Sequence, residues 1–257
     1  MPTATLAGRV DATFRGTGGT LTARCAPPLE LRGPFHGGAA PRYFLRNVTC
    51  GAFGGDSYDV RLHADDGARV LVTPSSATKA YRSTGAATHF RTRLEASTGA
   101  LLALDGGLTI VQAGSDVTQD IEIVVRDDGR VVYSEVLALG RLASGERLAF
   151  RRFASSLRVR DGQDRLLYED RYALLPGTHA ELIDAAVGGA GVVGSLVLAG
   201  AAPPLDALLN GADASVLAGW SAFPRGAGVV VRALGPRAEP VVQLLTSIVD
   251  AAIAESP

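Results

Sequence analysis

Four segments of the chain share one pattern of apolar and polar positions. They span residues 58–73, 90–105, 119–135 and 155–170. In each segment apolar and polar residues alternate up to a tight turn, as at Ile121 and Ile123, and a short apolar run follows the turn. This pattern is typical of two β-strands joined by a hairpin turn whose glycine adopts a positive φ.

The turns recur at a nearly constant interval. Their glycines, Gly67, Gly99, Gly129 and Gly162, follow one another after 32, 30 and 33 residues. Such a period marks supersecondary units that stack on one another. We therefore predict an all-β fold, an irregular β-helix or solenoid-like stack of hairpins. A β-sandwich is the alternative, because its strands also carry regular turn signals.

Polar residues occupy similar places where the second strand of each unit ends. Thr73, Asp105 and Glu135 each lie six residues after the turn glycine, and Asp170 lies eight residues after it in a lengthened turn. If the units stack, these residues form a polar line. The alternative is that they end strands at the surface, as polar residues commonly do.

The last third of the chain has a different character. We expect one domain over residues 1–257, with a β-rich body over 1–200 and a C-terminal region over 201–257. Prolines before and a glycine after residues 204–210 predict a short helix there, and a second is expected at about 240–254. Its apolar residues recur at three- and four-residue steps and should pack on the core: Val241, Leu244, Leu245, Ile248, Val249 and Ala252.

Composition narrows the class of partner. The 257 residues are 47% hydrophobic, and 25 Lys and Arg against 26 Asp and Glu leave a formal charge of −1. Without a basic field, binding to nucleic acid or to a membrane surface is not expected. There is no 18-residue apolar run and no secretory signal pattern, and Cys25 and Cys50 are too few for a disulfide scaffold. We expect a cytosolic protein.

No motif for catalysis or cofactor binding stands out. The chain lacks a Gly-x-Ser-x-Gly elbow and a His-Glu-x-x-His pair, and its four histidines are scattered. The segment 189–194 matches Gly-x-Gly-x-x-Gly, but a strand pattern follows it where a dinucleotide site needs a helix. We predict neither an enzyme nor a tightly bound cofactor. Two alternatives stay open: a small all-β hydrolase or lyase pairing Asp56 with Glu135, and a ligand-binding module using the loop Gly54–Asp56.

Two neighbouring segments carry a resemblance to a known family. Residues 47–56 read Asn-x-x-x-Gly-x-x-x-Gly-Asp and end at Asp56, and residues 77–83 read Ala-Thr-Lys-Ala-Tyr-Arg-Ser. In this order they resemble the UreD (UreH) family of urease accessory proteins, and residues 134–146, 158–171, 189–196 and 228–235 are similar to later segments of that family. The chain departs from the family pattern at Cys50 and at residues 105–107, where a Pro-Gln-Pro-like stretch is usual.

The resemblance implies a cytosolic scaffold with a β-helical fold and two C-terminal helices, without enzymatic activity of its own. Such proteins bind apo-urease subunits and UreF, which recruits the GTPase UreG, and GTP hydrolysis by that partner drives nickel delivery. The family is thought to offer nickel a route through its interior.

Our hypothesis is that a polar passage is lined by Asp56, Thr78, Glu135 and Asp170, with Asp105 as a further candidate. Carboxylates and hydroxyls hold Ni²⁺ more weakly than imidazole or thiolate, which suits transient contact. The loop residues Lys79, Tyr81 and Arg82 are candidates for partner binding.

Overall fold

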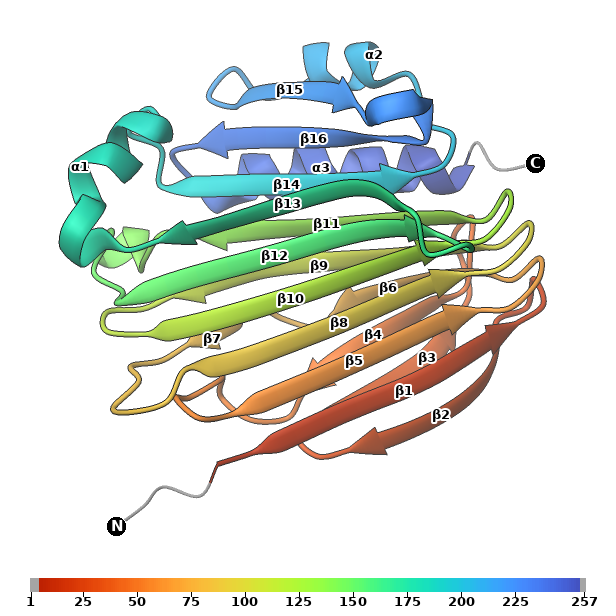
Figure 1. Cartoon of the computed structure of the whole chain (residues 1–257), viewed down its shortest axis with the longest axis horizontal. Helices are drawn as coiled ribbons and strands as arrows, with labels where there is room; N and C mark the ends of the chain where they lie inside the picture. The colour runs from red at the N-terminus through yellow and green to blue at the C-terminus, as the bar shows by residue number, and fades with distance from the viewer. Residues whose placement is uncertain (1–4, 255–257) are drawn as a thin grey trace.

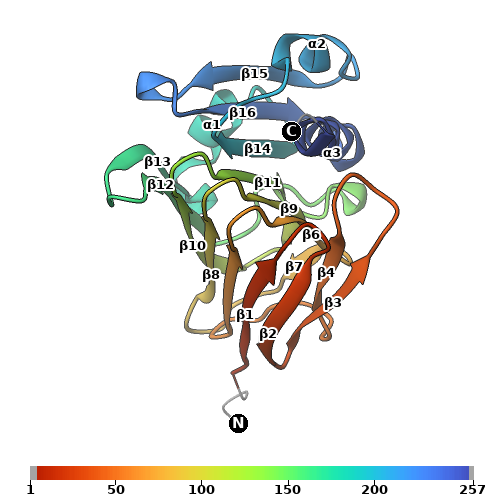
Figure 2. The ribbon, with the colours of Figure 1, turned by 90° about the vertical axis from the view of Figure 1, so that its right-hand side faces the viewer.

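Two β-sheets face each other across an apolar interior in the computed structural model, which describes residues 5–254 (Figures 1 and 2). The seven-stranded sheet has the order β13-β12-β10-β8-β5-β1-β2. The nine-stranded sheet has the order β15-β16-β14-β11-β9-β6-β4-β3, and the short strand β7 pairs with β9. The predicted all-β, solenoid-like architecture is confirmed.

The strands of the seven-stranded sheet are β1 (Ala7–Arg15), β2 (Thr20–Ala26), β5 (Ser57–Ala64), β8 (Thr88–Ala96), β10 (Asp116–Val125), β12 (Arg152–Asp161) and β13 (Leu166–Leu174). Those of the nine-stranded sheet are β3 (Leu29–Phe35), β4 (Arg42–Asn47), β6 (Arg69–Pro74), β7 (Thr78–Ala80), β9 (Leu101–Val111), β11 (Arg130–Ala138), β14 (Val192–Ala199), β15 (Leu217–Ala222) and β16 (Gly228–Gly235). The helices are α1 (Pro176–Ala186), α2 (Leu205–Asn210) and α3 (Ala238–Ala254), with single 3₁₀ turns at Leu142–Ser144 and Pro224–Gly226.

The repeat units are arches and not hairpins, apart from the fourth. After each of the first three turns the chain crosses to the other sheet, so β5, β8 and β10 lie parallel in one sheet and β6, β9 and β11 lie parallel in the other. Only β12 and β13 form the predicted antiparallel hairpin. The apolar run after each of the first three turns explains the crossing, because a strand that is apolar on both faces needs a sheet that is covered on both sides.

Stacked apolar side chains fill the space between the sheets. Ala12, Leu62, Leu94, Ile123 and Val159 are register partners on five adjacent strands, and each is at most 2% exposed. The sequence period arises from this ladder, since each coil must return an apolar residue to the same position. Each buried leucine contributes roughly 1.5–3 kcal/mol.

The turns are not equivalent, although all four contain glycine. Gly67 and Gly99 have φ near +67°, but in the third turn the residue with positive φ is Asp127. Gly129 is needed there for a different reason, because a Cβ would lie 2.5 Å from the carbonyl oxygen of Ser97. As a result Arg130 pairs with Leu101. If the turn glycines were aligned, Val131 would stand opposite Leu101 instead, so the third repeat unit, or coil, is displaced by one residue.

Helix α3 covers the outer face of the nine-stranded sheet, as Figure 2 shows. The apolar stripe predicted for residues 240–254 is buried against β9, β11 and β14, and the helix begins two residues earlier than expected. Gly194 lies under it, since a Cβ there would be 2.6 Å from Val241 Cγ1. The Gly-x-Gly-x-x-Gly match is therefore the entry of a closely packed strand, as predicted.

Two other helices differ in how well the sequence indicated them. Helix α2 spans 205–210, within the range expected from its flanking prolines and glycine. Helix α1 was not expected. It begins at Pro176 and buries Pro176 and Ile183, while most of its other residues are exposed. Its weak apolar periodicity explains why it was missed. No helix among residues 5–254 is long and apolar enough to span a membrane.

The ladder predicts a stability difference between two matched substitutions. Leu94→Ala should lower the free energy of unfolding by about 2–5 kcal/mol, because it leaves a cavity in a closely packed stack. Leu217→Ala, at a leucine that is 73% exposed on β15, is the control and should change it by less than about 0.5 kcal/mol. Urea unfolding followed by circular dichroism measures both, and equal losses would contradict the ladder.

Candidate functional site

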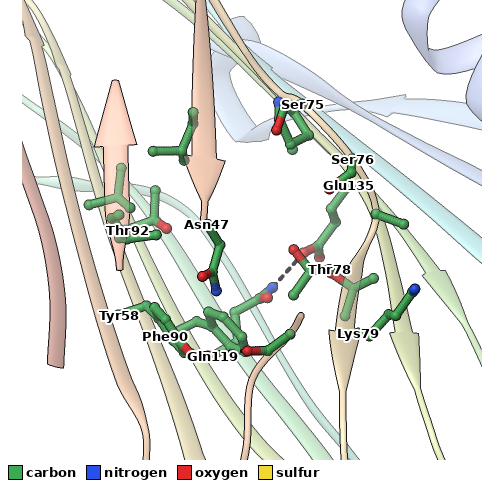
Figure 3. Close-up of a pocket in the computed structure, with 18 of the residues that line it drawn as sticks. Asn47, Tyr58, Ser75, Ser76, Thr78, Lys79, Phe90, Thr92, Gln119 and Glu135 are labelled. Atoms are coloured by element: carbon green, nitrogen blue, oxygen red, sulfur yellow. Dashed lines mark hydrogen bonds between the residues drawn. The ribbon is translucent and has the colours of Figure 1, made fainter. Parts of the chain in front are cut away.

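A cavity of about 510 Å³ lies between the two sheets and opens beside residues 47–51 and 74–79 (Figure 3). Its floor carries Gln119, Tyr133 and Glu135, and its rim carries hydroxyls of the loop before β7. Among its lining residues Glu135 is the only carboxylate. The lining comprises Leu29, Leu45, Asn47, Thr49, Cys50, Gly51, Tyr58, Val60, Pro74, Ser75, Ser76, Ala77, Thr78, Lys79, Phe90, Thr92, Leu104, Gly106, Thr109, Gln119, Tyr133 and Glu135.

Glu135 points into this cavity from the same face of β11 as Tyr133, and the strand pairing opposite it is irregular. Ser134 pairs with Asp105 and Val136 with Leu108, so two residues, Gly106 and Gly107, oppose Glu135. Both must be glycine, since a Cβ on Gly106 would lie 2.4 Å from the oxygen of Ser134, and Gly107 has φ +66°. This bulge lies at residues where the chain departs from the sequence pattern that it resembles, and it leaves room for the Glu135 side chain.

Two neutral donors hold the Glu135 carboxylate. Gln119 Nε2 donates a hydrogen bond to it, drawn as a dashed line in Figure 3, and the Tyr133 hydroxyl donates another at 2.9 Å. Burial raises the pKa of Glu135 above its ordinary value, although both hydrogen bonds oppose the rise. Burial, with Glu135 nearby, also raises the pKa of Tyr133. Within residues 5–254, Glu135 thus stands in a confined polar site and accepts hydrogen bonds from neutral donors, with no cation bonded directly to it.

Asp56 supports the wall of the cavity and does not face it. It is 3% exposed, and its oxygens accept hydrogen bonds from the amides of Leu6 (2.8 Å) and Phe53 (2.9 Å) and from the Tyr58 hydroxyl (3.0 Å). Tyr58 in turn lines the cavity. Asp56 therefore positions the segment 53–58.

Gly54, which precedes Gly55 and Asp56, must be glycine because the chain is closely packed there. A Cβ on Gly54 would lie 2.7 Å from the Cα of Ser83, in the segment that resembles the family's second motif. The two recognition segments are therefore in contact: Gly54 packs on Ser83, and Phe53 stacks on Tyr81 with ring centres 4.8 Å apart.

The predicted polar line is not continuous. Asp105 lies on the opposite face of the nine-stranded sheet from Glu135, where it accepts hydrogen bonds from Ser134 Oγ (2.8 Å) and from Thr246 Oγ1 of α3 (3.2 Å). Thr73 lies near it in a separate small pocket. The expectation was wrong because the third coil is displaced by one residue, and a shift of one residue along a strand moves a side chain to the other face.

Asp170 belongs to a second polar cluster near the end of the seven-stranded sheet. Arg232 of β16 donates hydrogen bonds to the carboxylate of Asp170, to Ser195 Oγ and, at 3.3 Å, to the Tyr168 hydroxyl. The charges of Arg232 and Asp170 act on Glu135 with opposite effects on its pKa. Sequence reasoning missed Arg232 as a site residue, because it lies 62 positions from Asp170 and no local motif marks it.

The other predicted residues lie in β7 or directly after it. Thr78 and Lys79 both line the cavity, Thr78 half-buried and Lys79 exposed. Tyr81 donates a hydrogen bond to the carbonyl oxygen of Cys50 at 3.1 Å, and Arg82 is exposed. Across residues 5–254, no three His, Cys, Asp or Glu side chains come together in a geometry that could hold a metal ion.

Comparison with known proteins identifies the family. A family model described as UreD urease accessory protein matches residues 7–256. The chain belongs to the UreD family. The UreD match includes every residue of the cavity, the polar cluster around Arg232 and Asp170, and α3. It confirms the resemblance found in the sequence.

Individual UreD relatives agree. The urease accessory protein UreD of Haloarcula marismortui is 34% identical over 209 residues, which cover 79% of this chain and 69% of the relative. That of Sorangium cellulosum is 35% identical over 228 residues, covering 85% and 70%. The protein named UreD 1 of Brucella melitensis is 31% identical over 176 residues, covering 68% and 60%.

The environment of Glu135 predicts a pH-dependent effect on stability. Because its pKa is raised in the folded chain, ionisation costs the folded state free energy as pH rises above the ordinary value of 4.5. Glu135→Gln keeps an acceptor for Gln119 and Tyr133 and removes this cost. The variant should therefore gain stability over wild type at pH 7 and lose that gain below about pH 4.

Urea unfolding at both pH values measures the gain. Glu181→Gln, at an exposed position on α1, is the matched control and should show no such pH dependence. A Glu135→Gln gain that is the same at pH 4 and pH 7 would contradict the assigned environment.

Proposed function

We propose that this chain is a non-enzymatic urease maturation factor, a scaffold that binds apo-urease and the UreF/UreG GTPase complex and supports nickel insertion into urease. Membership of the UreD family over residues 7–256 supports it. The two cysteines, both exposed and unpaired, fit action in a reducing cytosol. GTP is bound by the partner in this scheme, and this chain has no tightly bound cofactor.

The observation that carries the nickel part of the proposal is the interior cavity with its single carboxylate. A divalent cation that enters past Thr78 meets one buried oxygen ligand, Glu135, together with amide and phenol oxygens. A site that offers a metal ion only a few oxygen ligands favours brief contact and release over storage. In this route Thr78 and Glu135 line the cavity and Asp170 stands at its far end.

The remaining two predicted residues have other places in the proposal. Asp56 acts indirectly by fixing Tyr58 in the cavity wall. Asp105 lies outside the route, because its carboxylate faces α3 on the other side of the sheet.

The rim of the cavity is our candidate for partner contact. Lys79 lines the cavity and is exposed, Arg82 is exposed three residues further along the chain, and Tyr81 is held by its stacking on Phe53 and its hydrogen bond to Cys50. A partner seated on this rim would receive or deliver the metal directly at the cavity mouth.

The geometry supports an acid–base enzyme less well. Asp56, which would have to pair with Glu135, is buried, and its carboxylate accepts three hydrogen bonds from the protein itself. It is therefore not available for proton exchange with a substrate in the cavity.

Co-expression tests the scaffold role. The chain should co-purify with UreF, UreG and the urease subunits in a pull-down through a tag on this chain, because the family resemblance implies contacts with all of them. The same tag on an unrelated β-rich protein serves as the control. Failure to associate with any of these partners would overturn the proposal.

Substitution of the cavity carboxylate tests the route. Glu135→Ala should leave complex formation intact and lower the nickel content of co-expressed urease several-fold, since it removes the only carboxylate of the cavity. Glu169→Ala, on the outer face of β13, is the control and should leave nickel unchanged. Metal analysis of purified urease is the measurement, and normal nickel in the Glu135→Ala sample would rule out this route.

A further inference from the structure

A layer of polar residues continues from the cavity towards the last strand of the seven-stranded sheet. Gln119 Nε2, which donates to Glu135, also lies 3.4 Å from Ser155 Oγ on the next strand. Ser155 is paired in register with Tyr172 of β13. Glu135, Arg232 and Asp170 all influence the pKa of Tyr172, so these groups lie within electrostatic range of one another.

Apolar clusters border this layer on both sides. Along β10 the inward residues are Val117, Gln119 and Ile121, and along β11 they are Tyr133, Glu135 and Leu137. The flanking residues belong to two separate apolar clusters. A charged group in the interior is therefore favoured within the polar layer, because apolar surroundings disfavour a charge.

At the far end the two sheets have unequal extent. The seven-stranded sheet ends with β13, whereas the nine-stranded sheet continues through β14 to β16 and β15, and Figure 2 shows these last two strands above the level of β13. Arg232 reaches from β16 across the gap to Asp170 on β13. Tyr168 of β13 stacks on Phe223 beside this contact, with ring centres 4.7 Å apart. This end of the polar layer is thus bridged by one guanidinium and one carboxylate.

The bridging pair is partly open to solvent. The side chains of Arg232 and Asp170 are 40% and 29% exposed, so the pair stands at the surface end of the layer while Glu135 stands deep within it. Ion pairs that water can reach are weak and open readily. The pair is therefore suited to opening and closing without disturbing the fold.

We propose that Arg232 is a gate for the cation at this end of the interior and that Asp170 is its latch. In the closed state the guanidinium, which is charged at all accessible pH values, repels a divalent cation and occupies the carboxylate of Asp170. In the open state Asp170 exchanges Arg232 for the metal ion. This inference rests on the proposed nickel route, and it assigns Arg232 a regulatory position that the route alone does not require.

A merely structural tie between the sheets is the competing explanation. The chain offers a matched comparison on the same hairpin, because Arg158 pairs with Glu169 at 3.1 Å on the outer face, with side chains 44% and 36% exposed. The Arg158 pair has similar exposure and no access to the interior layer. If the Arg232 pair is only a structural tie, loss of either pair should lower stability and leave metal affinity unchanged. If Arg232 is a gate, its loss should change metal affinity, and loss of Arg158 should not.

The test uses the full chain in its complex with UreF and UreG and Ni²⁺ alone as the probe, titrated by calorimetry. Arg232→Gln should bind Ni²⁺ about tenfold more tightly, the change expected when a unit charge is removed about 6 Å from a divalent ion in water. Arg232→Lys, which keeps the charge, and Arg158→Gln should both match wild type. Adding Glu135→Gln to Arg232→Gln should abolish the gain.

A second variant covers the case in which Arg232→Gln does not assemble. Asp170→Asn leaves Arg232 in place and removes the carboxylate that it binds. The variant should weaken Ni²⁺ binding and reduce nickel in urease. If every Arg232 or Asp170 variant that assembles binds Ni²⁺ with unchanged affinity, the gate is overturned. The route still stands in that case if Glu135→Ala lowers the nickel content of urease. Normal urease loading in Glu135→Ala would overturn the route, and the gate with it.

Discussion

Parallel, in-register stacking places each residue of one coil beside the equivalent residue of the next, and the rest of this structure depends on that constraint. Leu62, Leu94 and Ile123 form a continuous apolar ladder because each coil returns the same kind of residue to the same position. The constraint also works in reverse. A residue inserted into or deleted from one turn changes the face of every residue that follows, until a bulge corrects the register.

The third coil shows this effect and its consequence for the site. Its turn differs by one residue from the two before it, so Glu135 faces the interior while Asp105 faces α3. The Gly106–Gly107 bulge then provides room opposite Glu135. A buried carboxylate costs free energy unless donors satisfy it, and Gln119 and Tyr133 supply them. The cavity is thus a product of one local departure from the repeat.

The two sheets differ because their outer faces have different surroundings. The outer face of the seven-stranded sheet carries charged residues in register, among them Arg61, Arg93, Glu122 and Arg158. The outer face of the nine-stranded sheet is covered by α3 over its central strands, of which β11 and β14 are buried on both faces. This difference also explains the far end of the interior. There the covered sheet continues past the charged one, and Arg232 spans the resulting gap to Asp170.

The sequence by itself determined the all-β repeat, the helices near residues 205 and 240 and the family, because apolar periodicity, flanking prolines and contacting motifs are local properties of the chain. It also indicated Thr78 and Glu135 as residues of one site, which the cavity brings together. Only the tertiary structure decided that the units are arches, that Asp105 lies outside the cavity and that Arg232 meets Asp170. Those features depend on strand register and on pairing between residues far apart in the chain, and neither leaves a local trace in the sequence.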